Sequence, residues 1–78
     1  MAQPRSKRHL AYGLAFRAVR QERGLSQERL AHLAGLDRTY VSGIERGERN
    51  PSLENLLRLA DTLDVDFSEI AQIAEDSD

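Results

Sequence analysis

The sequence predicts an all-α domain, a compact bundle of five helices that contains a helix-turn-helix. Apolar residues recur at helical spacing in several stretches, which are separated by glycine, proline, serine and aspartate. Aromatic residues make up only 5% of the chain, which suits a small helical bundle. At 78 residues the chain is one domain near the lower size limit for unaided folding, and without cysteine it has no disulfide to support it.

The stretch from Ser26 to Asn50 is the centre of this prediction. Ser26 is a good N-cap, because its hydroxyl can accept a hydrogen bond from a free backbone N–H. Gly35 ends the first helix, since glycine adopts the left-handed conformation at little cost, and Asp37 caps a second helix. Apolar residues recur on one face of each helix: Leu30, Ala31 and Ala34, then Val41 and Ile44. This order is typical of the helix-turn-helix, whose second helix enters the DNA major groove.

Three further helices complete the predicted bundle. We expect the first from about Leu10 to Arg23, and the two central helices at Gln27–Ala34 and from Arg38 to about Arg46. Ser52 caps the fourth, whose apolar residues are Leu53, Leu56, Leu59, Ala60 and Leu63. The fifth, about Phe67 to Ala74, must pack on the fourth because so short a helix is unstable alone. We expect residues 1–9 to form a flexible basic arm, 10–74 the domain and 75–78 a frayed acidic tail.

Charge is distributed unevenly along the chain, although its net value is only −2. Residues 1–23 hold six basic residues against one acid, a net +5, whereas residues 51–78 hold one arginine against eight acids, a net −7. This separation of basic and acidic residues between the two ends of the chain indicates an anionic partner. A disordered basic arm and a solvated acidic tail would produce the same pattern. The arm either contacts DNA or only keeps the chain soluble.

Other classes of protein find little support in the sequence. No run approaches the roughly 20 apolar residues of a membrane span, and no signal peptide is visible, so we expect a soluble, cytoplasmic protein. His9 and His32 lie far apart, with no cysteine or acidic cluster at ligand spacing, so no metal site is expected. No cofactor or small-molecule ligand is evident from the sequence. The chain has no evident nucleophile–base pair, which argues against an enzyme.

The polar face of the helix that begins at Arg38 carries the candidate base-reading residues Arg38, Thr39 and Ser42. Arginine can donate two hydrogen bonds to guanine, and threonine and serine can bond base edges. Arg38 lies at the start of its helix, where the macrodipole disfavours a cation, so function explains it better than stability does. The alternatives are a solvated Arg38 paired with Asp37 or Glu45, and a Thr39 that serves local capping.

A set of short motifs resembles the phage-repressor and Cro-like (Xre-type) helix-turn-helix regulators: residues 16–20, 24–31, 35, 44–47 and 51–53. Within that family, Leu36–Arg46 together with Arg49 and Asn50 is similar to the controller proteins of restriction–modification systems. Those proteins are short, all-helical, dimeric transcription regulators. The resemblance covers roughly residues 12–74.

The resemblance implies roles for individual residues. Gln27 binds a DNA phosphate near its own helix terminus, and Arg20 and Glu45 form a buried salt bridge between the first and third helices. Four further residues match positions that reach the DNA backbone or neighbouring bases: Tyr40, Arg46, Arg49 and Asn50. Independently of the resemblance, Tyr40 either packs against the loop or contacts a phosphate, and Arg17 is either a phosphate contact or a solvated side chain. Two residues depart from the family pattern: Gly43 replaces a base-reading glutamine of some phage repressors, and Glu48 places an acid near the phosphate-binding loop.

Two functions of different classes are compatible with these features. The first is a sequence-specific, double-stranded DNA-binding transcriptional regulator, a homodimer on a two-fold operator, because a dimer doubles the few base contacts of one domain. Its expected interface residues are Leu57, Phe67, Ile70 and Ile73. The alternative is a protein-interaction module or antitoxin on the same fold, which uses the apolar face of the fifth helix. The polar residues at 38, 39 and 42 favour the regulator.

Overall fold

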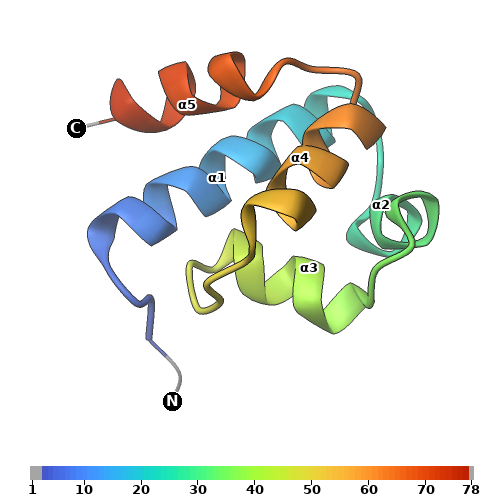
Figure 1. Cartoon of the computed structure of the whole chain (residues 1–78), viewed down its shortest axis with the longest axis horizontal. Helices are drawn as coiled ribbons and strands as arrows, with labels where there is room; N and C mark the ends of the chain where they lie inside the picture. The colour runs from blue at the N-terminus through green and yellow to red at the C-terminus, as the bar shows by residue number, and fades with distance from the viewer. Residues whose placement is uncertain (1–2, 78) are drawn as a thin grey trace.

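The structure, a computed structural model, describes residues 3–77, in which it has five α-helices and no strand. They are α1 (Lys7–Glu22), α2 (Gln27–Ala34), α3 (Arg38–Glu45), α4 (Leu53–Thr62) and α5 (Phe67–Glu75), as Figure 1 shows. The prediction of an all-α fold with a helix-turn-helix is confirmed. The bounds of α2 are those predicted, and α3 ends one residue before the expected Arg46.

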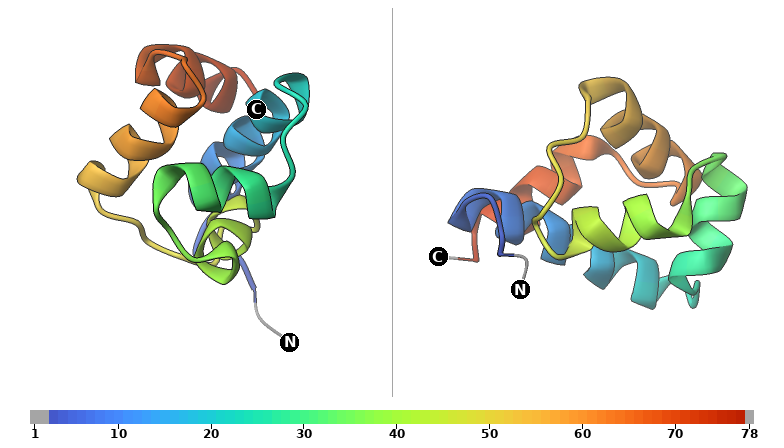
Figure 2. Two further views of the ribbon diagram at one scale, coloured as in Figure 1. Left: turned by 90° about the vertical axis from the view of Figure 1, so that its right-hand side faces the viewer. Right: turned by 90° about the horizontal axis from the view of Figure 1, so that it is seen from below.

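The caps of α2 and α3 fix the two helices of the motif. The Ser26 hydroxyl accepts a hydrogen bond from the backbone N–H of Arg29 at 3.0 Å, and the Asp37 carboxylate accepts one from that of Thr39 at 3.0 Å. Between the helices Gly35 has φ +69°, a conformation that side chains disfavour. The chain therefore turns sharply from α2 into α3, as two further views show (Figure 2).

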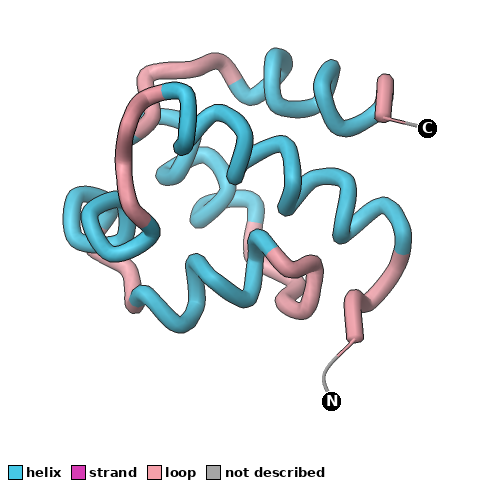
Figure 3. The backbone as a smooth tube through the Cα atoms, turned by 180° about the vertical axis from the view of Figure 1, so that it is seen from behind, coloured by secondary structure: helices cyan, strands magenta, loops and turns pink. Residues whose placement is uncertain are grey.

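α1 begins at Lys7 and not at the expected Leu10. Ser6 caps it, because its hydroxyl accepts a hydrogen bond from the backbone N–H of His9 at 3.0 Å. Residues 7–9 of the expected arm are therefore helical. The residue before the cap is also held, since the Arg5 N–H donates to the Gly47 carbonyl at 2.8 Å. Figure 3 shows the loop after α3 beside the start of α1.

α5 packs mainly along α1 and not, as the sequence suggested, on α4 (Figure 1). The centroid of the Phe67 ring lies 6.2 Å from that of Tyr12 and 6.3 Å from that of Phe16. At the other end of α5, the Glu75 carboxylate accepts hydrogen bonds from the Tyr12 hydroxyl at 2.8 Å and from the Arg8 guanidinium. Glu75, expected in a frayed tail, is thus the last residue of α5 and is joined to α1.

All five helices contribute to one apolar core. Each supplies a side chain that is at most 1% exposed: Phe16, Leu30, Val41, Leu59 and Ile70. Ile70 therefore cannot form part of a dimer interface, as the sequence suggested, because it faces inward at 0% exposure. No helix within residues 3–77 has both the length and the apolar character needed to cross a membrane.

Candidate nucleic-acid interface

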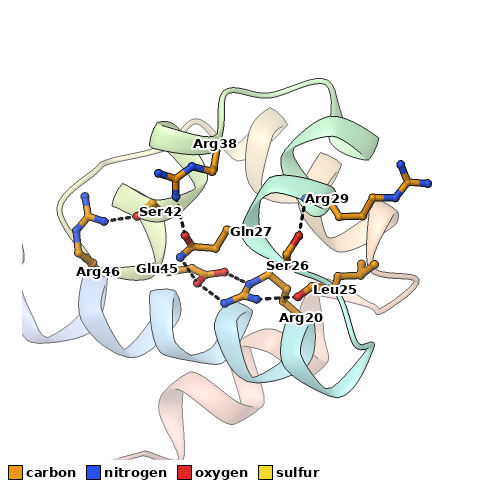
Figure 4. Close-up of polar contacts among 9 residues, drawn as sticks. All are labelled: Arg20, Leu25, Ser26, Gln27, Arg29, Arg38, Ser42, Glu45 and Arg46. Carbon is orange, nitrogen blue, oxygen red and sulfur yellow. Dashed lines mark hydrogen bonds and ion pairs between the residues drawn. The ribbon is translucent and has the colours of Figure 1, made fainter.

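The first turn of α3 presents two of the three candidate base readers to solvent, Arg38 and Thr39. Ser42, one turn later, is only 9% exposed, and its hydroxyl accepts a hydrogen bond from the Arg46 guanidinium (Figure 4). Ser42 therefore does not project beside the other two residues, contrary to the expectation from the sequence. Arg46 lies four residues later, on the same side of the helix, and its guanidinium occupies the hydroxyl of Ser42.

A buried ion pair joins α1 to the end of α3 beneath this surface (Figure 4). Arg20 is 7% exposed and Glu45 is 4% exposed. The Arg20 Nε and Nη2 donate to the two carboxylate oxygens of Glu45 at 2.7 and 3.0 Å, and Nη1 donates to the Leu25 carbonyl at 2.7 Å. The fork of the guanidinium is thus satisfied on both sides, as a buried charge requires.

Gln27 links the buried pair to the exposed face of α3. Its amide Nε2 donates to Glu45 Oε1 at 2.9 Å, and its Oε1 lies 3.4 Å from Arg38 Nη1, which donates to it. The short chain of contacts runs from Arg20 through Glu45 and Gln27 to Arg38 (Figure 4). The position of the Arg38 side chain at the surface is therefore connected to a group that is fixed inside the fold.

Arg49 lies across α3, a placement that the sequence did not reveal. Its guanidinium carbon is 5.9 Å from the centroid of the Tyr40 ring, within the range of a cation–π contact. A Cβ at Gly43 would lie 2.7 Å from Arg49 Cγ. Gly43, which the sequence presented only as a lost base reader, therefore leaves the space that Arg49 occupies. In the sequence, the only sign of this arrangement was that position 43 holds glycine where some phage repressors hold glutamine.

Two of the three remaining candidate backbone contacts, Arg46 and Asn50, are exposed at the end of α3 and in the loop after it. The third, Arg17, lies apart from them. Arg46 also pairs with Glu48 at 3.1 Å, so the acid near the loop is partly neutralised. The Asn50 Oδ1 lies 3.3 Å from His9 Nε2, which connects the loop to α1. Arg17 is exposed on α1, and no side-chain hydrogen bond within residues 3–77 joins it to the residues of α3 or its loop.

Comparison with known proteins shows to which family the chain belongs. A family model described as helix-turn-helix matches residues 16–70. The chain belongs to the helix-turn-helix family of transcription regulators. The relatives described next confirm the resemblance to Xre-type regulators and, within them, to controller proteins.

Several relatives of this helix-turn-helix regulator are controller proteins by name. It is 44% identical over 57 residues to control protein C.BamHI of Bacillus amyloliquefaciens, covering 72% of this chain and 70% of that protein. It is 42% identical over 62 residues to control protein C.MunI of a Mycoplasma species, covering 78% and 84%. The crystal structure of the restriction-modification controller protein C.AhdI from Aeromonas hydrophila superposes with a TM-score of 0.78 at 52% identity, covering 80% and 94%. Across the relatives, the match spans between 37% and 84% of their own lengths.

Apolar side chains are also exposed on this helix-turn-helix domain, away from α3. Leu57 on α4 and Ile73 on α5 are each 42% exposed, and Phe67 is partly buried against α1. Leu53, at the start of α4, is 64% exposed and was not among the residues expected at an interface. Three of the four expected interface residues therefore retain accessible surface, and Ile70 does not.

Proposed function

We propose that this regulator binds double-stranded DNA sequence-specifically as a homodimer, with α3 in the major groove. Arg38 donates two hydrogen bonds to guanine, and Thr39 contacts the neighbouring base edge. One observation carries the proposal: Arg38 is exposed at the start of α3 and is bonded to Gln27, which is itself bonded to the buried Glu45. An arginine whose direction is set in advance loses less conformational freedom on binding than a freely rotating one.

The surrounding groups suit contacts to the DNA backbone. Tyr40, Arg46, Arg49 and Asn50 surround α3 and its loop, and Gln27 and Arg17 extend the contact to α2 and α1. Ser42 acts through Arg46, whose guanidinium it holds. The acidic turn between α4 and α5 lies on the opposite side of the molecule from α3, so its carboxylates stay away from the phosphates (Figures 1 and 2).

The dimer doubles the base contacts that one short helix can make. Leu57, Phe67 and Ile73 supply the apolar part of its interface, because they lie on α4 and α5 and remain accessible in the single chain. A two-fold dimer places its two copies of α3 at half-sites about 34–36 Å apart. The names of the relatives support a finer proposal, that the regulated genes belong to a restriction–modification system. This function requires no catalytic group and takes place in the cytoplasm.

Selection of bound sites from a random duplex pool, with the mass of each complex measured, tests the proposal. We expect a palindromic site bound by two chains. Replacing Arg38 by alanine should lower the ratio of operator to random-DNA affinity by about 5- to 150-fold, which corresponds to about 1–3 kcal/mol for one base contact. The exposed Arg58→Ala is the matched control, because it removes the same charge from α4. No enriched site, or an unchanged ratio for Arg38→Ala, would leave the protein-interaction module as the better hypothesis.

A further inference from the structure

A cavity of about 280 Å³ opens between α1, the loop after α3, and the helices α4 and α5. Its floor is apolar, because Phe16 is 1% exposed and Ile44 is 4% exposed, and Leu56 and Phe67 line it beside them. Arg49 and Asn50, both exposed, also line it. The volume is just below the usual range of small-molecule sites, about 300–1,000 Å³, so only a small ligand fits.

The lining of this cavity includes arginine side chains but no carboxylate. Thirteen acidic residues occur in the chain, yet none lines the cavity, whereas Arg8 and Arg49 do. Arg8 is compensated, because Glu75 at the edge accepts its hydrogen bond. Arg49 differs, since no carboxylate in residues 3–77 lies within 4 Å of its guanidinium. Arg49 is therefore the lining cation that has no carboxylate partner among the described residues.

We propose that this cavity binds a small aromatic or branched-chain monocarboxylate. The Arg49 guanidinium, which lies over the Tyr40 ring in the free chain, turns toward the cavity and donates two hydrogen bonds to the carboxylate, a geometry that matches its fork. Asn50 adds a donor, because its Oδ1 already faces His9 and leaves the amide Nδ2 for the anion. The hydrocarbon part lies between Phe16, Leu56 and Phe67. A monocarboxylate suits this lining best, because a dianionic compound would leave its second charge over the apolar floor and a neutral one would not use the charge of Arg49.

Binding of such a ligand weakens DNA binding, a consequence that rests on the proposed function. Arg49 and Asn50 are also proposed to contact the DNA backbone, and one guanidinium cannot hold a ligand carboxylate and a phosphate with the same donors. Because coupling between two sites is reciprocal, DNA lowers the affinity for the carboxylate by the same factor.

A titration of the full chain without DNA tests the site itself. Phenylacetate is the probe and the neutral phenylacetamide is its isostere, each followed through the backbone amide resonances. We expect saturable shifts at Gly13, Asn50 and Phe67. Affinity for the amide should be lower by about tenfold or more, since a hydrogen bond to a charged group contributes about 1.5–3 kcal/mol. Equal affinity for acid and amide, or shifts centred on Leu57 and Ile73, would overturn the proposal.

Two variants with the same change in net charge sharpen this titration. Arg49→Gln should weaken phenylacetate binding by about tenfold, and Arg58→Gln on α4 should leave it unchanged, because Arg58 does not line the cavity. Thermal unfolding of both variants checks that each is folded. Equal loss in the two variants would show adventitious attraction to positive charge and would overturn the site.

A second titration with DNA separates this proposal from the preceding one. Fluorescence anisotropy of a labelled selected duplex should show weaker binding in saturating phenylacetate and unchanged binding in phenylacetamide. Ligand binding without this effect would support the site and overturn the coupling. Failure to select any duplex would contradict the proposed function, whereas the titration without DNA would still decide the site.

Discussion

Replacing Glu45 by alanine should destabilise this domain more than any change at an exposed acid. The substitution leaves the Arg20 guanidinium, 7% exposed, without a counterion, and removes the acceptor of the Gln27 amide. Removing one partner of a buried pair costs about 3–5 kcal/mol. A domain of this length is stable by about 4–12 kcal/mol, so the loss is a large part of the total.

Urea unfolding followed by circular dichroism measures this loss. With a slope of about 1 kcal/mol per molar urea for a small protein, the midpoint should fall by about 3 M or more. Glu45→Gln provides a milder variant, which keeps an acceptor oxygen and the shape while removing the charge, in case the alanine variant is unfolded.

Glu48→Ala is the matched control for this experiment. Glu48 pairs with Arg46 at 3.1 Å, but the Arg46 side chain is 52% exposed, and such surface pairs contribute about 0–1 kcal/mol. We therefore expect a midpoint shift below about 1 M. Comparable shifts for Glu45→Ala and Glu48→Ala would refute the reasoning, because they would mean that burial of the pair has no energetic consequence.

Two glycines and one carboxylate provide further tests. Gly13→Ala should lower the unfolding free energy by about 1–3 kcal/mol or more, because its methyl group would press on the backbone carbonyls of Ile44 and Glu45. Gly43→Ala should raise the unfolding free energy by up to about 1 kcal/mol, since only the flexible Arg49 side chain must move. DNA affinity should fall in the same variant. Equal destabilisation by Gly13→Ala and Gly43→Ala would contradict this reasoning. The Tyr12 hydroxyl and then Arg8 lower the pKa of Glu75 below its usual 4.5. A carboxyl group whose pKa is lower in the folded state than in the unfolded state stabilises the fold at pH values above its unfolded-state pKa. This stabilisation is lost as the pH falls through its folded-state pKa. Glu75→Gln should therefore flatten the acid side of a plot of urea midpoint against pH, and Glu69→Gln, on the same helix, should not.

Local signals predicted the motif well because its caps and turn act over a few residues. Ser26, Gly35 and Asp37 each determine the conformation of their neighbours, and the structure places the helix ends at them. Ser6 is a signal of the same kind, but the basic residues after it have no apolar periodicity, and so the expected helix began too late. Cap chemistry was in this case a better guide than hydrophobic spacing.

Long-range packing accounts for what the sequence did not reveal. The apolar residues of α5 cover more than one face, so the periodicity alone could not distinguish the buried Ile70 from the exposed Ile73. The distinction depends on α1, which lies far away in the sequence and receives the inward face. Ser42 and Gly43 are similar cases, because the side chains of Arg46 and Arg49, which follow α3, lie against these two positions.

The network from Arg20 to Arg38 raises the question of why a small core retains a buried charge pair. Apolar replacement of such a pair is often neutral or stabilising. The double variant Arg20→Met with Glu45→Leu should therefore unfold within about 1 kcal/mol of the wild type, or later. Its ratio of operator to random-DNA affinity should nevertheless fall, because Gln27 loses the acceptor that holds it beside Arg38. Gln27→Ala, which breaks the same connection at its other end, should lower this ratio to a similar degree. When Gln27→Ala is added to the double variant, the ratio should fall little further. If the double variant keeps the full ratio, the pair serves only the fold, and Arg38 is oriented by DNA alone.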